Sequence, residues 1–132
     1  MYHPKMVQFR ARLDDMFDEV DHYIENKYGE LYPLHPMRPR RGDTANPQAD
    51  GLFNIGADFT PGFGTEHGRG YIIDIKMVTL EMVDDEVRAE ITDDVVDKLR
   101  ELLPRYFPER KLEIYAEKNH FKICGDFSLG YV

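Results

Sequence analysis

Apolar side chains recur every three or four residues across 5–28, a spacing that predicts an amphipathic helix. Charged residues fill most of the remaining positions, and Gly29 gives a natural end to the helix. The stripe fits a helix that packs on its own chain. Because the spacing persists for nearly three heptads, it also fits a seam between two copies. The stripe comprises Met6, Phe9, Leu13, Met16, Val20 and Tyr23, widened by Val7, Phe17 and Ile24.

A two-residue alternation of apolar and polar side chains predicts strands over 52–59 and 71–80. The glycine-rich stretch between them fits the tip of a hairpin. Two further strands are predicted at 111–117 and 120–127, joined at Lys118-Asn119. We expect a tight turn there, because asparagine tolerates a positive φ.

A second helix is predicted to begin at Thr92, which is a good N-cap. Asp93 and Asp94 would lie in its first turn, where acidic side chains complement the helix dipole. An apolar stripe then continues from Val95 to Phe107. Pro104 is expected to kink or end this helix.

Residues 31–51 contain four prolines, which exclude a regular helix or a central strand. The segment is therefore predicted to be a long, mostly extended loop, with specified turns at Asn46-Pro47 and Asp50-Gly51. Loops of about twenty residues in small domains are usually functional or disordered.

These elements follow the order helix, strand, strand, helix, strand, strand. The sequence thus predicts one α+β domain over 1–132, with the helix at 5–28, the loop at 31–51 and a ββαββ body at 52–132. We expect a four-stranded, mainly antiparallel sheet with both helices on one face.

A short phrase occurs twice: IGADFTPGF at 55–63 and ICGDFSLGY at 123–131. It falls in the first strand of one hairpin and the second strand of the other, so a simple tandem duplication does not explain it. We expect each copy to end a strand at one rim of the sheet. Phe59 and Phe127 would anchor in the core, the aspartate would face outward, and Thr60 or Ser128 would bond local backbone.

Net charge of the 132-residue chain is -8, which disfavours generic binding to DNA or to an anionic membrane. Cys124 is the single cysteine, so no internal disulfide can form. No apolar run is long enough to span a bilayer, and the N-terminal stretch lacks a signal-peptide core. We therefore expect a cytoplasmic protein, with neither nucleic acid nor membrane as a partner.

Arginines gather in the long loop and at the hairpin tip, although the chain as a whole is acidic. Guanidinium groups bind carboxylate or phosphate through paired donors, and glycines let backbone N–H groups approach an anion. We predict a site for a small anion or an acidic partner segment, without a cofactor or metal. The alternative is that these arginines pair with aspartates of the chain. The predicted ligand-binding residues are Arg38, Arg40, Arg41, Asn46, Gly64, His67 and Arg69.

Two other functions stay open. In the first, Asp58 and Asp74 approach across neighbouring strands and act with His67 on a phosphorylated or carboxylated metabolite. The same carboxylates would otherwise form an ion-pair ladder with Lys76. In the second, the chain is a structural subunit of a homo-oligomer whose 31–51 loop wraps a neighbouring subunit. For the binding domain we expect a homodimer, joined through helix 5–28 or through the 31–51 loop.

Overall fold

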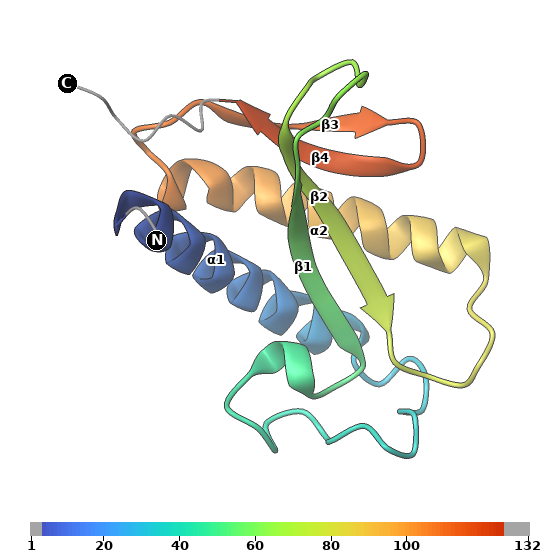
Figure 1. Ribbon diagram of the computed structural model, residues 1–132. Helices are drawn as coiled ribbons and strands as arrows, with labels where there is room; N and C mark the ends of the chain where they lie inside the picture. The colour runs from blue at the N-terminus through green and yellow to red at the C-terminus, as the bar shows by residue number, and fades with distance from the viewer. Residues whose placement is uncertain (1–3, 126–132) are drawn as a thin grey trace.

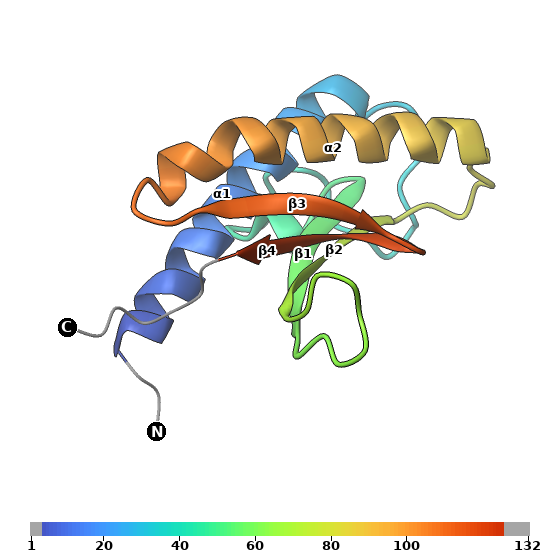
Figure 2. The same cartoon turned by 90° about the horizontal axis from the view of Figure 1, so that it is seen from above.

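Both helices lie on one face of a four-stranded antiparallel sheet in the computed structural model, which describes residues 4–125 (Figure 1, Figure 2). This confirms the predicted α+β class and order of elements. The strand order is β1-β2-β4-β3. The elements are α1 (Pro4–Tyr28), a 3-10 turn η1 (Pro47–Ala49), β1 (Phe53–Thr60), β2 (Gly70–Met77), α2 (Asp85–Tyr106), β3 (Leu112–Glu117) and β4 (His120–Gly125).

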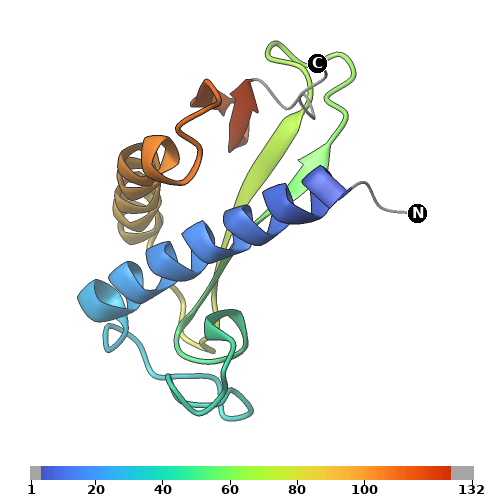
Figure 3. The same cartoon turned by 90° about the vertical axis from the view of Figure 1, so that its left-hand side faces the viewer.

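Helix α1 lies across the sheet, beside α2 (Figure 3), and its apolar stripe packs inside its own chain. Met16, Val20 and Ile24 are fully buried there. The core-facing interpretation of this helix is therefore confirmed, and a pairing of two copies through it stays a prediction. No helix within residues 4–125 is long and apolar enough to cross a membrane.

Helix α2 begins at Asp85, with Asp84 as its N-cap, so the predicted start at Thr92 is wrong. Two features of the preceding segment explain the earlier start. Val87 and Ile91 extend the apolar stripe backward at four-residue spacing, and Ile91 is buried. Asp85 and Glu86 supply the acidic first turn that was assigned to later residues.

The turn between β3 and β4 also differs from the prediction. Lys118 and Asn119 do join the two strands, because Glu117 pairs with His120. No residue other than glycine has a positive φ within residues 4–125, so the expected left-handed asparagine is absent from this turn.

Strands β1 and β4, in which the two copies of the repeated phrase begin, run in the same direction on either side of β2. Tyr71 of β2 pairs with Phe59 on one side and with Ile123 on the other. Asp58 is exposed and the Thr60 hydroxyl accepts a hydrogen bond from Gly62 N at 3.2 Å, both as expected. Phe59 is 55% exposed, so its predicted core anchoring is wrong. Phe127 and Ser128 lie outside the described residues.

Phe59 emerges because β1 extends past the end of the core. Its neighbours on α1, in the first turns of the helix, are the exposed Met6 and Val7. Its alternation with Ala57 places it on the helix-bearing face, where its ring contacts the edge of the partly buried Tyr71 ring, with centroids 5.5 Å apart. The alternation of apolar and polar residues therefore predicted the face of the sheet on which Phe59 lies, but not how far its side chain is buried.

Strand β1 forms one edge of the sheet, and side chains cover its outward carbonyls. Leu52 O accepts a hydrogen bond from Val78 N at 2.7 Å on the β2 side, so the alternate carbonyls at 53, 55 and 57 point away from β2. Each of these three accepts a side-chain hydrogen bond, which blocks a further strand from pairing there. The donors are Arg38 to Phe53 O, Gln48 to Ile55 O, and Arg10 to Ala57 O.

The contrast between buried and exposed apolar residues gives a stability prediction. Ile55→Ala removes a side chain that is fully buried in β1 and should lower the free energy of unfolding by about 2–5 kcal/mol, measured by urea denaturation. Phe63→Ala, at a side chain that is 91% exposed, should change it by less than about 0.5 kcal/mol. Equal losses in the two variants would contradict this position of the core.

Candidate functional site

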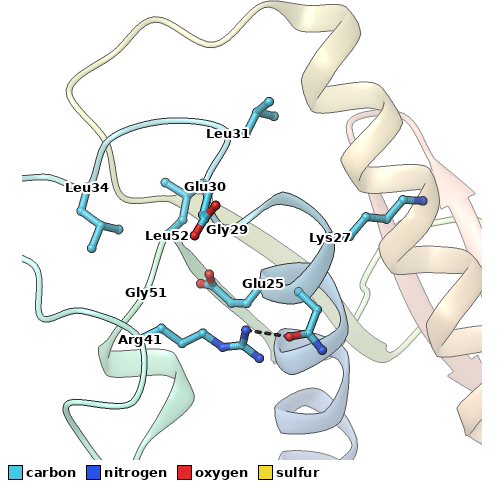
Figure 4. A pocket seen from close by; sticks show the side chains of 10 residues that line it. Glu25, Lys27, Gly29, Glu30, Leu31, Leu34, Arg41, Gly51 and Leu52 are labelled. Carbon is cyan, nitrogen blue, oxygen red and sulfur yellow. Dashed lines mark hydrogen bonds between the residues drawn. The ribbon is translucent and has the colours of Figure 1, made fainter.

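A cleft of about 640 Å³ lies where the last turns of α1 meet the long loop and the start of β1 (Figure 4). Its wall combines three leucines with two carboxylates and two cationic side chains. This mixture of apolar surface and a few charged groups is typical of small-molecule sites. The lining residues are Glu25, Asn26, Lys27, Gly29, Glu30, Leu31, Leu34, Arg41, Gly51 and Leu52.

Glu25 joins the helix to the strand at the floor of this cleft. Its side chain is only 5% exposed, and Oε1 accepts a hydrogen bond from Phe53 N at 2.7 Å. A Cβ on Gly29 or Gly51 would lie within 2.6 Å of its carboxylate oxygens. Gly51 also has a φ of 74°. A Cβ at Gly29 would also meet the backbone carbonyl oxygen of Glu25 at 2.4 Å, and the positive φ of Gly51 itself favours glycine, so both positions suit a residue without a side chain.

Burial raises the pKa of Glu25, and the hydrogen bond from Phe53 N opposes that rise. One helical turn earlier, Asp21 is 2% exposed, and its Oδ2 atom has no hydrogen-bond partner among the described residues. Burial, together with the charges of Glu25, Asp18 and Asp50, raises the pKa of Asp21 to about 8. Asp21 is therefore mostly protonated and neutral at pH 7.

Arg38, a predicted anion donor, is engaged in holding the loop closed. Its Nε donates to Gly51 O at 3.0 Å, and one terminal nitrogen donates to Gln48 O at 2.7 Å and to Asp50 O at 3.0 Å. The same nitrogen reaches Phe53 O at 3.1 Å. Four backbone carbonyls that the loop leaves without strand partners thus converge on one guanidinium group. Arg38 is not a member of the cleft wall.

The loop is further ordered by the carboxylate of Asp50. Its Oδ2 accepts hydrogen bonds from Gly42 N, Thr44 N and the Thr44 hydroxyl, between 2.9 and 3.2 Å. Burial acts to raise the pKa of Asp50, but the hydrogen bonds from Thr44 and Gly42 outweigh it and the pKa is lowered. Asn46 caps η1 by accepting from Gln48 N, as the specified turn at Asn46-Pro47 predicted.

Arg41 lies at the side of the cleft and is the predicted ligand-binding arginine that lines it (Figure 4). One terminal nitrogen donates to Asn26 Oδ1 at 2.7 Å. The other donates to His22 O at 3.3 Å and lies 3.4 Å from His22 Nδ1. All of these partners are uncharged acceptors when the imidazole is neutral, and Arg41 makes no ion pair within residues 4–125. Its positive charge is therefore not neutralised by direct contact.

Arg40 is exposed on the same loop but does not line the cleft. Its backbone N donates to Asp43 Oδ2 at 3.1 Å, and its carbonyl accepts from Asp43 N. Within the described part of the chain, its guanidinium group forms no hydrogen bond. Although Arg40 is next to Arg41 in the sequence, only Arg41 of the two lines the cleft.

The hairpin tip lies at the opposite end of β1 from the long loop (Figure 1, Figure 3). The eight residues of β1 separate the two segments. Gly64, His67 and Arg69 are therefore not brought together with Arg38, Arg40, Arg41 and Asn46. The predicted ligand-binding residues form two groups, and the arginine at the cleft belongs to the loop group.

The tip is held against β3 and β4 by a network that sequence reasoning missed. Lys122 is fully buried; its Nζ lies 2.9 Å from Glu117 Oε2 and donates to the Thr65 hydroxyl at 3.0 Å. Glu117 also accepts from His67 N, and the His67 ring stacks on Tyr115 with centroids 3.8 Å apart. Alternation places Lys122 on the face opposite Ile123, and nothing in that pattern shows that the tip folds over it.

The carboxylates of the enzyme alternative share the outer face of the sheet but are not direct partners. Asp58 pairs with Ile72, and Asp74 pairs with Gly56. Asp74 lies 3.5 Å from Lys76, as the ion-pair ladder predicted for these two residues. His67 is turned toward Tyr115 of β3. Within residues 4–125, no group of three or more His, Cys, Asp or Glu side chains is placed to hold a metal ion.

The role of Arg38 can be tested by its removal. Arg38→Met leaves several loop carbonyls without a donor and should lower the free energy of unfolding by about 2–3 kcal/mol, measured by chemical denaturation. Arg40→Met, two residues away and exposed, is the matched control and should cost less than about 0.5 kcal/mol. Similar losses in both variants would show that the loop does not depend on Arg38.

Asp21 predicts a pH dependence. A carboxyl group whose pKa is higher in the folded protein keeps its proton there after the unfolded chain has lost it. Folding therefore weakens as pH rises from 3.8 to about 8, by up to about 1.4 kcal/mol per pH unit from this one group. Asp21→Asn removes this contribution, so its stability gain over wild type should grow across that range and then level off.

The measurement is urea denaturation at several pH values between 4 and 9. Asp15→Asn, at an exposed position of the same helix, is the control and should show a much smaller change in stability than Asp21→Asn. A difference between Asp21→Asn and wild type that does not change with pH would contradict the raised pKa.

Comparison with known proteins adds two relationships. A protein family described as "Uncharacterised protein" matches residues 4–125. The chain is 43% identical, over 123 residues, to an uncharacterised protein of Borreliella burgdorferi, covering 93% of this chain and 96% of that protein. No solved structure matches the chain.

Proposed function

Since the chain belongs to this family of uncharacterised proteins, we propose its function from its own cleft: it is a small binding domain that holds an anionic small molecule through Arg41. The ligand lies between the end of α1 and the long loop. Its anionic group, a phosphate or a carboxylate, faces the guanidinium group of Arg41.

The observation that carries this proposal is the state of Arg41. It is exposed at the cleft, and its hydrogen bonds go to Asn26 Oδ1 and His22 O, which carry no formal charge. The buried Asp21 nearby has a pKa of about 8 and so does not cancel the charge of Arg41 at neutral pH. An anion would gain a charge-assisted hydrogen bond without first displacing an ion pair.

The other charges of the cleft limit what the ligand can be. Lys27 is engaged by Asp94, with Nζ 2.7 Å from Oδ2, which leaves Arg41 as the cation available to a ligand among the lining residues. Glu25 and Glu30 would repel a second anionic group. We therefore favour a ligand with one anionic group and an apolar part that contacts Leu31, Leu34 and Leu52. The volume of about 640 Å³ suits a small molecule better than an acidic partner segment.

A thermal-shift titration tests the proposal. Inorganic phosphate and a set of monocarboxylates with apolar tails should raise the melting temperature of the wild type with concentration, as mass action requires. Arg41→Gln should abolish this rise, because it removes the positive charge and leaves a polar, uncharged side chain at the cleft. Arg69→Gln, an exposed arginine at the opposite end of β1, is the matched control and should keep the full rise.

Sodium chloride at equal ionic strength separates binding from general screening. A rise that chloride reproduces, or one that Arg69→Gln loses as completely as Arg41→Gln, would contradict a site at the cleft. Absence of any rise across the ligand set would overturn the proposal for these two ligand classes.

A further inference from the structure

The cleft at the end of α1 has a negative side as well as a positive one. Gly29 N donates to Glu25 O at 2.8 Å and Leu31 N donates to Tyr28 O at 2.9 Å, so the chain turns tightly as the helix ends. This turn places Glu30 in the same wall of the cleft as Glu25 (Figure 4). The carbonyl end of a helix also carries partial negative charge. Two carboxylates and the end of α1 therefore make this side of the cleft attractive to a cation.

No cation of the chain neutralises these carboxylates by direct contact. Lys27 of the cleft wall is paired with Asp94, with Nζ 2.7 Å from Oδ2. Glu25 accepts a hydrogen bond from the uncharged Phe53 N. Within the part of the chain that the structure describes, the exposed side chain of Glu30 makes no hydrogen bond or ion pair. An ammonium group would therefore bind here without displacing an existing ion pair.

The positive and negative sides of the cleft interact but do not touch. Burial raises the pKa of Glu25, and both the hydrogen bond from Phe53 N and the charge of Arg41 oppose that rise. Arg41 nevertheless forms no ion pair with Glu25 or Glu30, because its hydrogen bonds hold it against Asn26 and the backbone of α1. Opposite charges that face one cleft at a fixed separation leave room for a ligand that carries both charges.

Apolar surface lies next to these charged groups. Leu31 directly follows Glu30, lines the cleft and is 50% exposed. Leu34 is partly buried and packs against the core, so it gives the same wall a fixed apolar surface. Hydrocarbon removed from water against these side chains adds a favourable, non-directional contribution to binding. The cleft therefore suits a ligand with an anionic group, a cationic group and an apolar part.

We propose that the cleft binds a small zwitterion with an apolar side chain, which is the chemistry of an apolar α-amino acid. Its carboxylate faces Arg41, its ammonium group faces Glu30 and Glu25, and its side chain contacts Leu31. This inference rests on the anion site proposed at Arg41 and adds to its ligand a second charge of opposite sign.

A pair of ligands that differ only in the amino group tests this inference. L-leucine and isocaproate share one carbon skeleton, and isocaproate lacks the ammonium group. Amide NMR of nitrogen-labelled protein at neutral pH follows Gly29 and Gly51 at the cleft, with Gly64 at the hairpin tip as the distant reference. The wild type should bind leucine about 3- to 10-fold more tightly than isocaproate, because the ammonium group gains charge-assisted contacts at a partly exposed site.

Glu30→Gln removes a negative charge from an exposed side chain that makes no contact in the fold. It should lower the affinity for leucine toward that for isocaproate and should not weaken isocaproate binding. Glu66→Gln is the matched control, at a side chain that is 80% exposed on the hairpin tip, and should keep the full preference for leucine. Unchanged amide spectra away from the cleft show that each variant is folded.

The outcomes separate this inference from the proposed function. Equal binding of leucine and isocaproate, with both lost in Arg41→Gln, would refute the zwitterion and leave the anion site. A preference for leucine that survives Glu30→Gln would refute it as well. Tighter binding of an ω-amino acid of equal carbon number would rule out the α-amino acid. If neither compound shifts Gly29 and Gly51, or if the shifts persist in Arg41→Gln, the anion site fails and this inference fails with it.

Discussion

A single buried carboxylate, that of Glu25, determines how the long loop joins the rest of the fold. It connects the last full turn of α1 to the first residue of β1 through a hydrogen bond to Phe53 N. An unpaired backbone N–H at that depth would cost about 1–3 kcal/mol. Two glycines leave room for the carboxylate, and Arg38 closes the loop around it through carbonyls that no strand satisfies. These contacts fix the loop and the start of β1 beside the last turns of α1, where the cleft lies.

Much of this fold was predictable from the periods of three to four and of two along the chain. Those periods reflect which side chains are removed from water, and they placed both helices, all four strands and the antiparallel sheet. The sequence predicted less well how deeply each side chain is buried and where each helix begins. Phe59 has the correct parity but lies beyond the core, and Thr92 has a good capping side chain but follows residues that already continue the stripe of α2.

The site was predicted less well, for a physical reason. Sequence shows where arginines are, but not whether their partners are carbonyls, carboxylates or water. Arg38 and Arg41 are three residues apart, yet one binds four backbone carbonyls and the other lies at an open cleft. Lys122 was missed for the same reason, because its partners on the hairpin tip are distant in sequence. Arg69 is far from the long loop because the hairpin tip and the loop lie at opposite ends of β1.

Long basic side chains that cover β1 have a counterpart on the other edge strand, where Arg100 donates to Ile114 O at 3.3 Å. These side-chain hydrogen bonds to the edge carbonyls last only while the segment that supplies the donor stays folded. Gln48 and Arg38 both belong to the proline-rich loop. Thermal opening of that loop would therefore free the carbonyls of Phe53 and Ile55 on the edge of β1 together. A further strand would then find free carbonyls along β1, whereas the donor to Ile114 O on β3 is carried by helix α2 and not by a loop.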